Sequence, residues 1–192
     1  MSEQNVASRT VNGAEYPAVG TYQIDATHSH VGFSVRHMAV AKVRGTFEQY
    51  AGTLELAENP VDSKISVTIE ATSIDTGDEN RDGHVRTGDF LDVENHPTWT
   101  FVSTAIRPES PTSWKVDGDL TIRGVTRPVT LDAELEGVVQ DPYGNHRVGF
   151  SAHTHIDRND FGVAFGAVLE AGGLVVGHKV DIQLDVEAVL AS

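Results

Sequence analysis

Residues 28–47, HSHVGFSVRHMAVAKVRGTF, contain the pattern that decides the fold. In the first half of this stretch, apolar residues occupy every second position and are followed by a histidine: Val31, Phe33, Val35 and His37. Successive side chains of a strand point to opposite faces of a sheet, so residues 28–38 are expected to form a strand with one apolar face. That face ends in an imidazole, which suits either a cavity for an amphiphile or an ordinary core with a hydrogen-bonded histidine.

The same period of two recurs along the rest of the chain. It is found at residues 20–24, 42–47, 52–56, 64–71, 97–106, 114–122, 129–139, 146–156 and 179–190. Each segment has one apolar and one polar face, which is typical of antiparallel sheets with a single wetted face. We therefore expect an all-β protein of eight or more antiparallel strands, forming either a closed barrel or a two-sheet sandwich. The longest strands favour the barrel, because closure leaves no sheet edge exposed.

Three stretches depart from this period. Residues 1–19 are polar and unpatterned, and we expect a flexible arm followed by one domain at residues 20–192. Residues 76–94 predict a short helix, opened by residues 78–82, with Val85, Phe90 and Leu91 near one face. Residues 157–177 are rich in glycine and aromatic residues and predict a loop with at most one short helical turn.

The composition limits the classes of function. The 192 residues include no cysteine, which excludes disulfides and cysteine-bound metals. Lys and Arg number 14 against 28 Asp and Glu, so the net charge is −14. Such a surface repels phosphate backbones and anionic lipid headgroups, and we expect no nucleic-acid partner, no peripheral membrane docking and no stable membrane insertion. The first 20 residues contain no apolar run of the kind a secretory signal needs, which predicts a cytoplasmic protein.

Histidines supply the main alternative function. His28 and His30 share one strand face, as do His153 and His155, and two such pairs could bind zinc in a metal-dependent hydrolase or isomerase. The simpler interpretation leaves His153 and His155 on a wet polar face without a metal. No serine lies in a nucleophile-elbow pattern, and no glycine-rich segment matches a phosphate or dinucleotide loop. We therefore expect no catalytic group, no cofactor and no metal, and a scaffold acting through its acidic surface is a third reading.

Five segments, in order, resemble the YceI family of lipocalin-like, polyisoprenoid-binding proteins. They are residues 24–37 (IDATHSHVGFSVRH), 43–47 (VRGTF), 81–101 (ending DFLDVENHPTWTF), 116–129 (VDGDLTIRGVTRPV) and 158–162 (RNDFG). No single segment is very specific, but the ordered set spans roughly residues 20–190. The alternating pattern alone leaves open whether the interior is filled or hollow, and the resemblance favours a hollow one.

The resemblance implies an antiparallel eight-stranded, lipocalin-like barrel with one short helical insertion. It also implies an apolar channel for a long-chain isoprenoid or acyl lipid, non-catalytic carriage or storage, and a homodimer. The channel wall expected from it consists of Val31, Phe33, Val35, Phe47, Ile65, Val67, Trp99, Phe101, Leu120, Leu131 and Phe150. Phe161 and Phe165 are expected at the mouth. His37 is favoured over Arg36 as the contact for a polar head, because Arg36 falls on the opposite strand face.

Overall fold

The structure, a computed structural model, describes residues 8–11, 13–166 and 175–191. The strands are β1 (Ser8–Val11), β2 (Ala14–Pro17), β3 (Gly20–Ile24), β4 (His30–His37), β5 (Ala41–Phe47), β6 (Tyr50–Leu56), β7 (Lys64–Glu70), β8 (Ile74–Asp75), β9 (Thr98–Pro108), β10 (Ser113–Ile122), β11 (Val125–Gln140), β12 (His146–Asp157) and β13 (Val176–Leu190). The helix α1 (Glu79–Arg86) and the 3-10 turns η1 (Pro60–Asp62), η2 (Ala71–Ser73) and η3 (Arg158–Phe161) complete the fold. No helix in the described part of the chain has the length and apolar character to cross a membrane.

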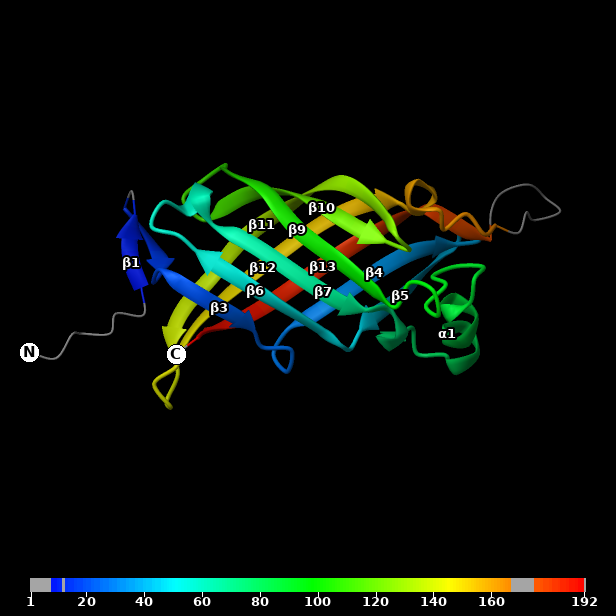
Figure 1. The fold of residues 1–192 in the computed structure, drawn as a ribbon, viewed down its shortest axis with the longest axis horizontal. Helices are drawn as coiled ribbons and strands as arrows, with labels where there is room; N and C mark the ends of the chain where they lie inside the picture. Colours follow the sequence, from blue (N-terminus) through cyan, green and yellow to red (C-terminus); the bar gives the residue numbers. More distant parts are fainter. Residues whose placement is uncertain (1–7, 12, 167–174, 192) are drawn as a thin grey trace, which may run out of the picture.

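The main sheet closes into an eight-stranded antiparallel barrel, as expected. Its order is β12-β11-β10-β9-β7-β6-β3-β13, and β13 pairs back onto β12. The free edge of β13 pairs with β3 near its end and with β4 over the rest of its length. The strands β4 and β5 therefore continue β3 and β6 along the barrel, so that they form the wall over the remaining length of β13. The barrel is elongated, with the β1–β2 hairpin at one end and α1 at the other (Figure 1).

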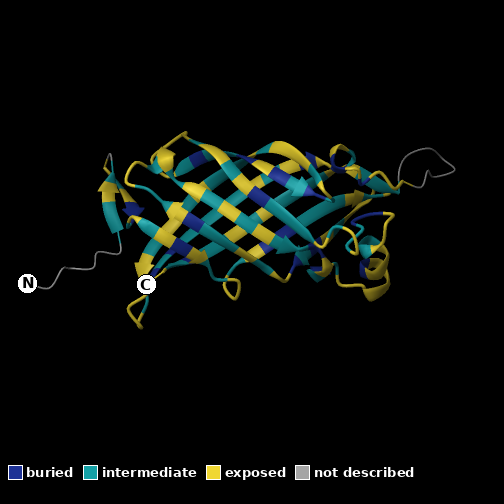
Figure 2. Cartoon of the chain, in the orientation of Figure 1, coloured by how far each residue is buried: buried dark blue, intermediate teal, exposed yellow. Residues whose placement is uncertain are grey.

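Alternation along each strand separates the interior from the surface. In β10 every second residue is buried, namely Trp114, Val116, Gly118, Leu120 and Ile122, whereas the residues between them are partly or fully exposed. Figure 2 shows the resulting chequered pattern of exposed and less exposed positions over the barrel wall. The apolar face of every long strand thus points inward, which confirms the period of two as the signal that specifies this fold.

Gly118 lies where the register between β9 and β10 shifts. A Cβ atom at Gly118 would lie 2.7 Å from the carbonyl oxygen of Val102 and would also meet the ring of Phe101. Because backbone atoms cannot rotate away, the strands pass this closely only with glycine at that position.

Gly118→Ala should lower the free energy of unfolding by about 2 kcal/mol, as overpacking commonly does. Gly137 is the matched control, since it also lies at a register shift and a Cβ there meets no atom within 4 Å. Gly137→Ala should be neutral or slightly stabilising, because alanine restricts the unfolded chain. Urea unfolding midpoints measure both effects, and equal midpoints for the two variants would contradict this account.

The N-terminal segment differs from the expected flexible arm. Residues 1–7 lie outside the described residues, but β1 and β2 pair into a hairpin. Tyr16 is 8% exposed and packs edge-on against Trp114, with ring centroids 5.7 Å apart. Arg9 donates to the carbonyl oxygens of Pro17 and Ala57, which ties the hairpin to the end of the barrel. The apolar part of this hairpin is too short for its alternation to stand out in the sequence.

The helix is confirmed but is shorter than the segment that predicted it. Asp78 caps α1 by accepting a hydrogen bond from the backbone N–H of Arg81 at 3.0 Å. Phe90 and Leu91 lie beyond the end of the helix rather than on its face, although both are buried. In the glycine-rich stretch, η3 is the short helical turn expected, and residues 167–174 lie outside the described residues.

Candidate functional site

The barrel is hollow. A cavity of about 490 Å³ is enclosed by the inward-facing side chains, a volume within the usual range for small-molecule sites. Every wall and mouth position expected from the sequence lines it: Val31, Phe33, Val35, His37, Phe47, Ile65, Val67, Trp99, Phe101, Leu120, Leu131, Phe150, Phe161 and Phe165. Whether these residues bind a ligand stays a prediction, but their common surface is apolar over most of its length.

Aromatic rings form one side of the cavity. The Phe33 and Phe47 rings lie 5.8 Å apart, and the Phe47 and Trp99 rings lie 4.7 Å apart, both tilted. The three rings come from β4, β5 and β9, so strands distant in sequence are brought together by one cluster. Tilted contacts of this kind stabilise the wall beyond simple burial and keep its surface flat and apolar.

The cavity opens at the α1 end. Among its described lining residues, the exposed ones are Arg36, Arg81, His84 and Phe165. At the opposite end the lining includes Tyr16 and Pro17 of the hairpin, which are both buried. We call the α1 end the mouth, and define it by Arg36, His37, Arg81, His84 and Phe165. The tail of a ligand that enters at the mouth would point toward the β1–β2 hairpin at the opposite end of the cavity.

The charge of the lining differs from that of the whole chain. It contains Arg9, Arg36, Arg81 and Arg158, whereas none of the described lining residues is Asp or Glu. This contrasts with a sequence that has twice as many acidic as basic residues, 28 against 14. All the charged side chains among the described lining residues are therefore basic. This suits a ligand whose polar head carries anionic or other hydrogen-bond-accepting oxygens.

Arg158 holds the mouth region together. It is 5% exposed, and it donates from Nε to the carbonyl oxygen of Gly177 at 2.9 Å and from Nη2 to that of Val176 at 3.1 Å. Burial lowers the pKa of Arg158, and the nearby Asp157 partly offsets this effect. The guanidinium thus fixes η3 against the start of β13, so that Phe161 lies in the cavity wall.

The expectation that Arg36 points away from the cavity is wrong. Both Arg36 and His37 line the mouth, although they are consecutive residues of β4, whose side chains normally point to opposite faces. The register between β4 and β13 shifts between Val176 and Val180, and the intervening Gly177 packs against Arg36. A Cβ at Gly177 would lie 3.2 Å from the Cβ of Arg36, so the missing side chain leaves room for the arginine at the rim.

Other residues line the cavity that the sequence did not predict as wall or mouth positions. Arg81 and His84 belong to the predicted helix, but nothing in the sequence places that helix over the barrel mouth. Tyr16 belongs to the segment read as an arm. Ala133 and Ala152 continue the alternation of their strands and could have been found from it, but alanine contributes only weakly to an apolar pattern.

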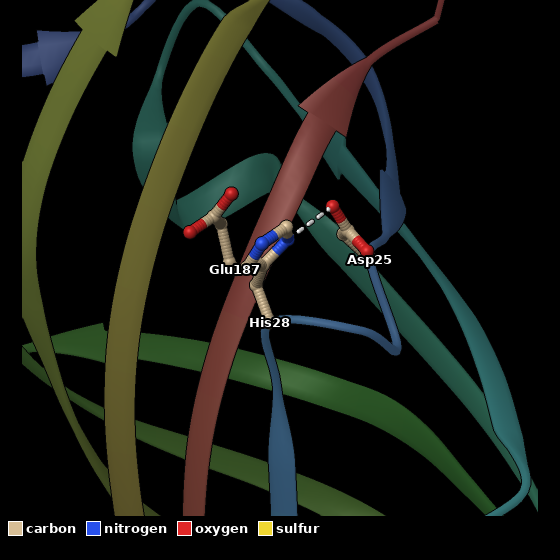
Figure 3. A group of neighbouring side chains, drawn as sticks. All are labelled: Asp25, His28 and Glu187. Atoms are coloured by element: carbon tan, nitrogen blue, oxygen red, sulfur yellow. Dashed lines mark hydrogen bonds and ion pairs between the residues drawn. The ribbon is translucent and has the colours of Figure 1, made fainter. Parts of the chain in front are cut away.

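The histidine pairs do not form one site. His30, His153 and His155 are exposed, and β13 lies between β4 and β12, the strands that carry them. Within the described ranges, one group of possible metal ligands is close enough to share an ion, namely Asp25, His28 and Glu187 (Figure 3). Arg147 already bridges its two carboxylates, since Nη1 donates to Asp25 at 2.9 Å and also to Glu187. This arrangement is an ion-pair network.

Acid should weaken this network. The pKa of Asp25 is held well below its usual range by hydrogen bonds from Thr27, His28 and Arg147, and that of Asp141 by Arg147 and Asn145. A folded-state pKa below the unfolded one contributes stability above the unfolded value of about 3.9 and loses it as the pH falls. The free energy of unfolding should therefore begin to fall near pH 5 and continue to fall as the pH drops below 3.

Arg147→Met tests the origin of this pH dependence. The variant should be less stable than the wild type at pH 7 and should show a shallower loss of stability in acid, because Asp141 loses its main partner. Arg127, whose guanidinium contacts only the carbonyl oxygen of Thr126 among the described residues, provides the control variant Arg127→Met. Urea unfolding at pH 7 and pH 3 measures the difference, and parallel acid curves for both variants would refute the assignment.

Comparison with known proteins agrees with this architecture. The family model of the YceI-like domain matches residues 22–188. The protein YceI of Escherichia coli is 41% identical over 145 residues, which cover 74% of this chain and 75% of that protein. A YceI protein of Campylobacter jejuni superposes with a TM-score of 0.70 at 27% identity, over 82% of this chain and 90% of that one.

A further structural match extends the comparison of folds. A polyisoprenoid binding domain from Saccharophagus degradans, implicated in plant cell wall breakdown, superposes with a TM-score of 0.68 at 16% identity, covering 88% of this chain and 98% of that domain. At this identity the likeness concerns the fold. Together with the family match across the whole barrel, these findings place the sequence: the chain belongs to the YceI-like domain family.

Proposed function

We propose that this protein binds and carries, or stores, a long-chain amphiphile of isoprenoid, isoprenoid-quinone or fatty-acyl type. The observation that carries the proposal is a long apolar cavity whose exposed lining residues gather at one end, the mouth. The polyisoprenoid-binding domain with the same fold supports the isoprenoid class. The tail would lie along the barrel and the head would remain among Arg36, His37 and Arg81.

Affinity would come mainly from the tail. Each methylene removed from water contributes about 0.8 kcal/mol, so a long chain binds tightly with few polar contacts. The wall presents mainly Phe, Val, Ile and Leu side chains, which, unlike the indole N–H of Trp99, have no hydrogen-bonding groups to select between prenyl and acyl chains. We therefore expect discrimination by chain length, with the basic mouth favouring heads that carry acceptor oxygens.

The proposed role involves no catalytic step, cofactor or metal. The histidine pairs lie on the outer face, and Arg147 neutralises the carboxylates of the grouped ligands. Metal analysis of purified protein tests this: stoichiometric zinc, iron or manganese would favour the hydrolase reading. A homodimer, which the family resemblance implies, and a cytoplasmic location stay predictions.

Native purification followed by organic extraction and mass spectrometry should yield one discrete prenylated or long-chain species near equimolar amount. If the extract is empty, titration with a fluorescent farnesyl analogue decides, since an unoccupied cavity takes up the analogue. A well-folded protein that yields no lipid and takes up no analogue would overturn the proposed function.

A further inference from the structure

The hairpin between β4 and β5 ends in an exposed apolar tip. It consists of Met38, Ala39 and Val40, of which Val40 is 83% exposed and Met38 40% exposed. Met38 and Ala39 have φ values of 52° and 60°, a left-handed conformation in which glycine or asparagine is usual. Neither turn geometry nor core packing therefore explains the choice of apolar residues at this tip.

Basic residues flank the tip on both strands. Arg36, Lys42 and Arg44 are exposed, and residues 26–47 include no acidic residue in a chain of net charge −14. Lys42 and Lys179 share a single carboxylate, that of Asp181, at 3.2 Å and 3.4 Å. Arg36 and Arg44 make no ion pair with any other residue that the structure describes. Arg36 and Arg44 thus flank the tip with positive charge that no residue in the described part of the chain neutralises.

The tip lies at the mouth of the cavity. Arg36 and His37, which immediately precede it, line the opening, and the backbone N–H of Met38 donates to the carbonyl oxygen of Val175 at 2.9 Å. Figure 1 shows β4 and β5 running together toward the end of the barrel where α1 lies. A surface that bound the tip would therefore face the opening through which a ligand must pass.

We propose that this tip is a docking element for the surface of an anionic phospholipid bilayer. Met38 and Val40 enter the interfacial region, while Arg36, Lys42 and Arg44 contact the lipid headgroups. Apolar insertion and attraction to anionic lipid are the two contributions that together hold proteins at a membrane surface. The net charge of −14 repels such a surface on average, and this opposing contribution keeps the attachment weak and reversible.

Flotation with vesicles tests the proposal. Wild-type protein should float with phosphatidylcholine–phosphatidylglycerol vesicles at low salt, and the bound fraction should fall with added salt or on pure phosphatidylcholine. Val40→Asp should reduce the partition coefficient about tenfold or more, because it removes an inserted side chain and adds a repelled charge. Arg44→Glu should weaken binding to the anionic vesicles.

Val139 offers the matched control. It is also an exposed valine, at 57%, and it pairs with Arg147 at the end of the barrel remote from the mouth. Val139→Asp should float like the wild type. Both aspartate variants should keep the wild-type melting temperature and the uptake of a fluorescent farnesyl analogue delivered from cyclodextrin, which separates docking from cavity binding. Wild-type protein that does not float with anionic vesicles, or equal losses in the two variants, would overturn the proposal.

Discussion

Ala133→Trp should abolish the binding of long chains while short chains remain bound. Ala133 lines the cavity and pairs with Trp114 on one side and Ala152 on the other, so the added indole would fill open space near the hairpin end. Each methylene that can no longer enter costs about 0.8 kcal/mol, and five of them cost about 4 kcal/mol, or roughly a thousandfold in affinity.

Titration with a series of acyl or prenyl probes of increasing length measures this effect. Affinity should rise with length in the wild type but stop rising at a shorter chain in the variant. Ala105, an exposed alanine on β9, provides the control Ala105→Trp, which should follow the wild-type curve. A uniform loss across all lengths would show that the ligand does not extend toward the hairpin.

Phe33→Asp should eliminate uptake of any long-chain probe. Phe33 lies in the aromatic side of the cavity, where a carboxylate would be surrounded by Phe47 and other apolar side chains. An ionised group in such surroundings is strongly disfavoured, so it would draw water into the cavity and oppose an apolar tail. We expect at least a hundredfold loss of affinity, a difference of about 2.7 kcal/mol.

Ser34→Asp is the control for this change, one position along the same strand. Ser34 lies on the outer face between Arg44 and Asp181, where a carboxylate is partly solvated and meets one positive and one negative neighbour. The variant should bind like the wild type, because adjacent strand residues point to opposite faces. Circular dichroism must show both variants folded, and comparable losses of affinity in both would contradict an internal binding site.

The apolar wall could be predicted because it depends on a local signal. Val31, Phe33 and Val35 alternate with polar neighbours within a single strand, and the barrel preserves that alternation whatever the rest of the chain does. The same reasoning located the inward residues of β7, β11 and β12. Hairpin connections between such segments predict antiparallel neighbours, but this pattern fits a sandwich as well as a barrel, and the closed eight-stranded ring was expected from the resemblance to the YceI family.

The mouth could not be predicted in the same way. Arg36 reaches the opening because β13 is irregular beside Gly177, and Arg81 does so because α1 lies across the end of the barrel. Both facts depend on how distant segments meet. Whether an apolar interior is filled or hollow likewise depends on the diameter of the ring and on the size of inward side chains such as Ala133, and the alternation of apolar residues reports neither of these quantities.

Ring closure also has a consequence for how the chain reaches its native state. Strand β13 completes the barrel by pairing Ala188 with Ile24 and Leu184 with Val31, contacts between opposite ends of the described chain. Contacts so distant in sequence form late and slow the folding reaction. Until they form, the inner face is an open apolar sheet with exposed edges, prone to associate with other chains. Refolding should therefore be slow and concentration-sensitive, and weakening the seam that β13 forms with β3 and β4 should impair folding yield before it affects any other property.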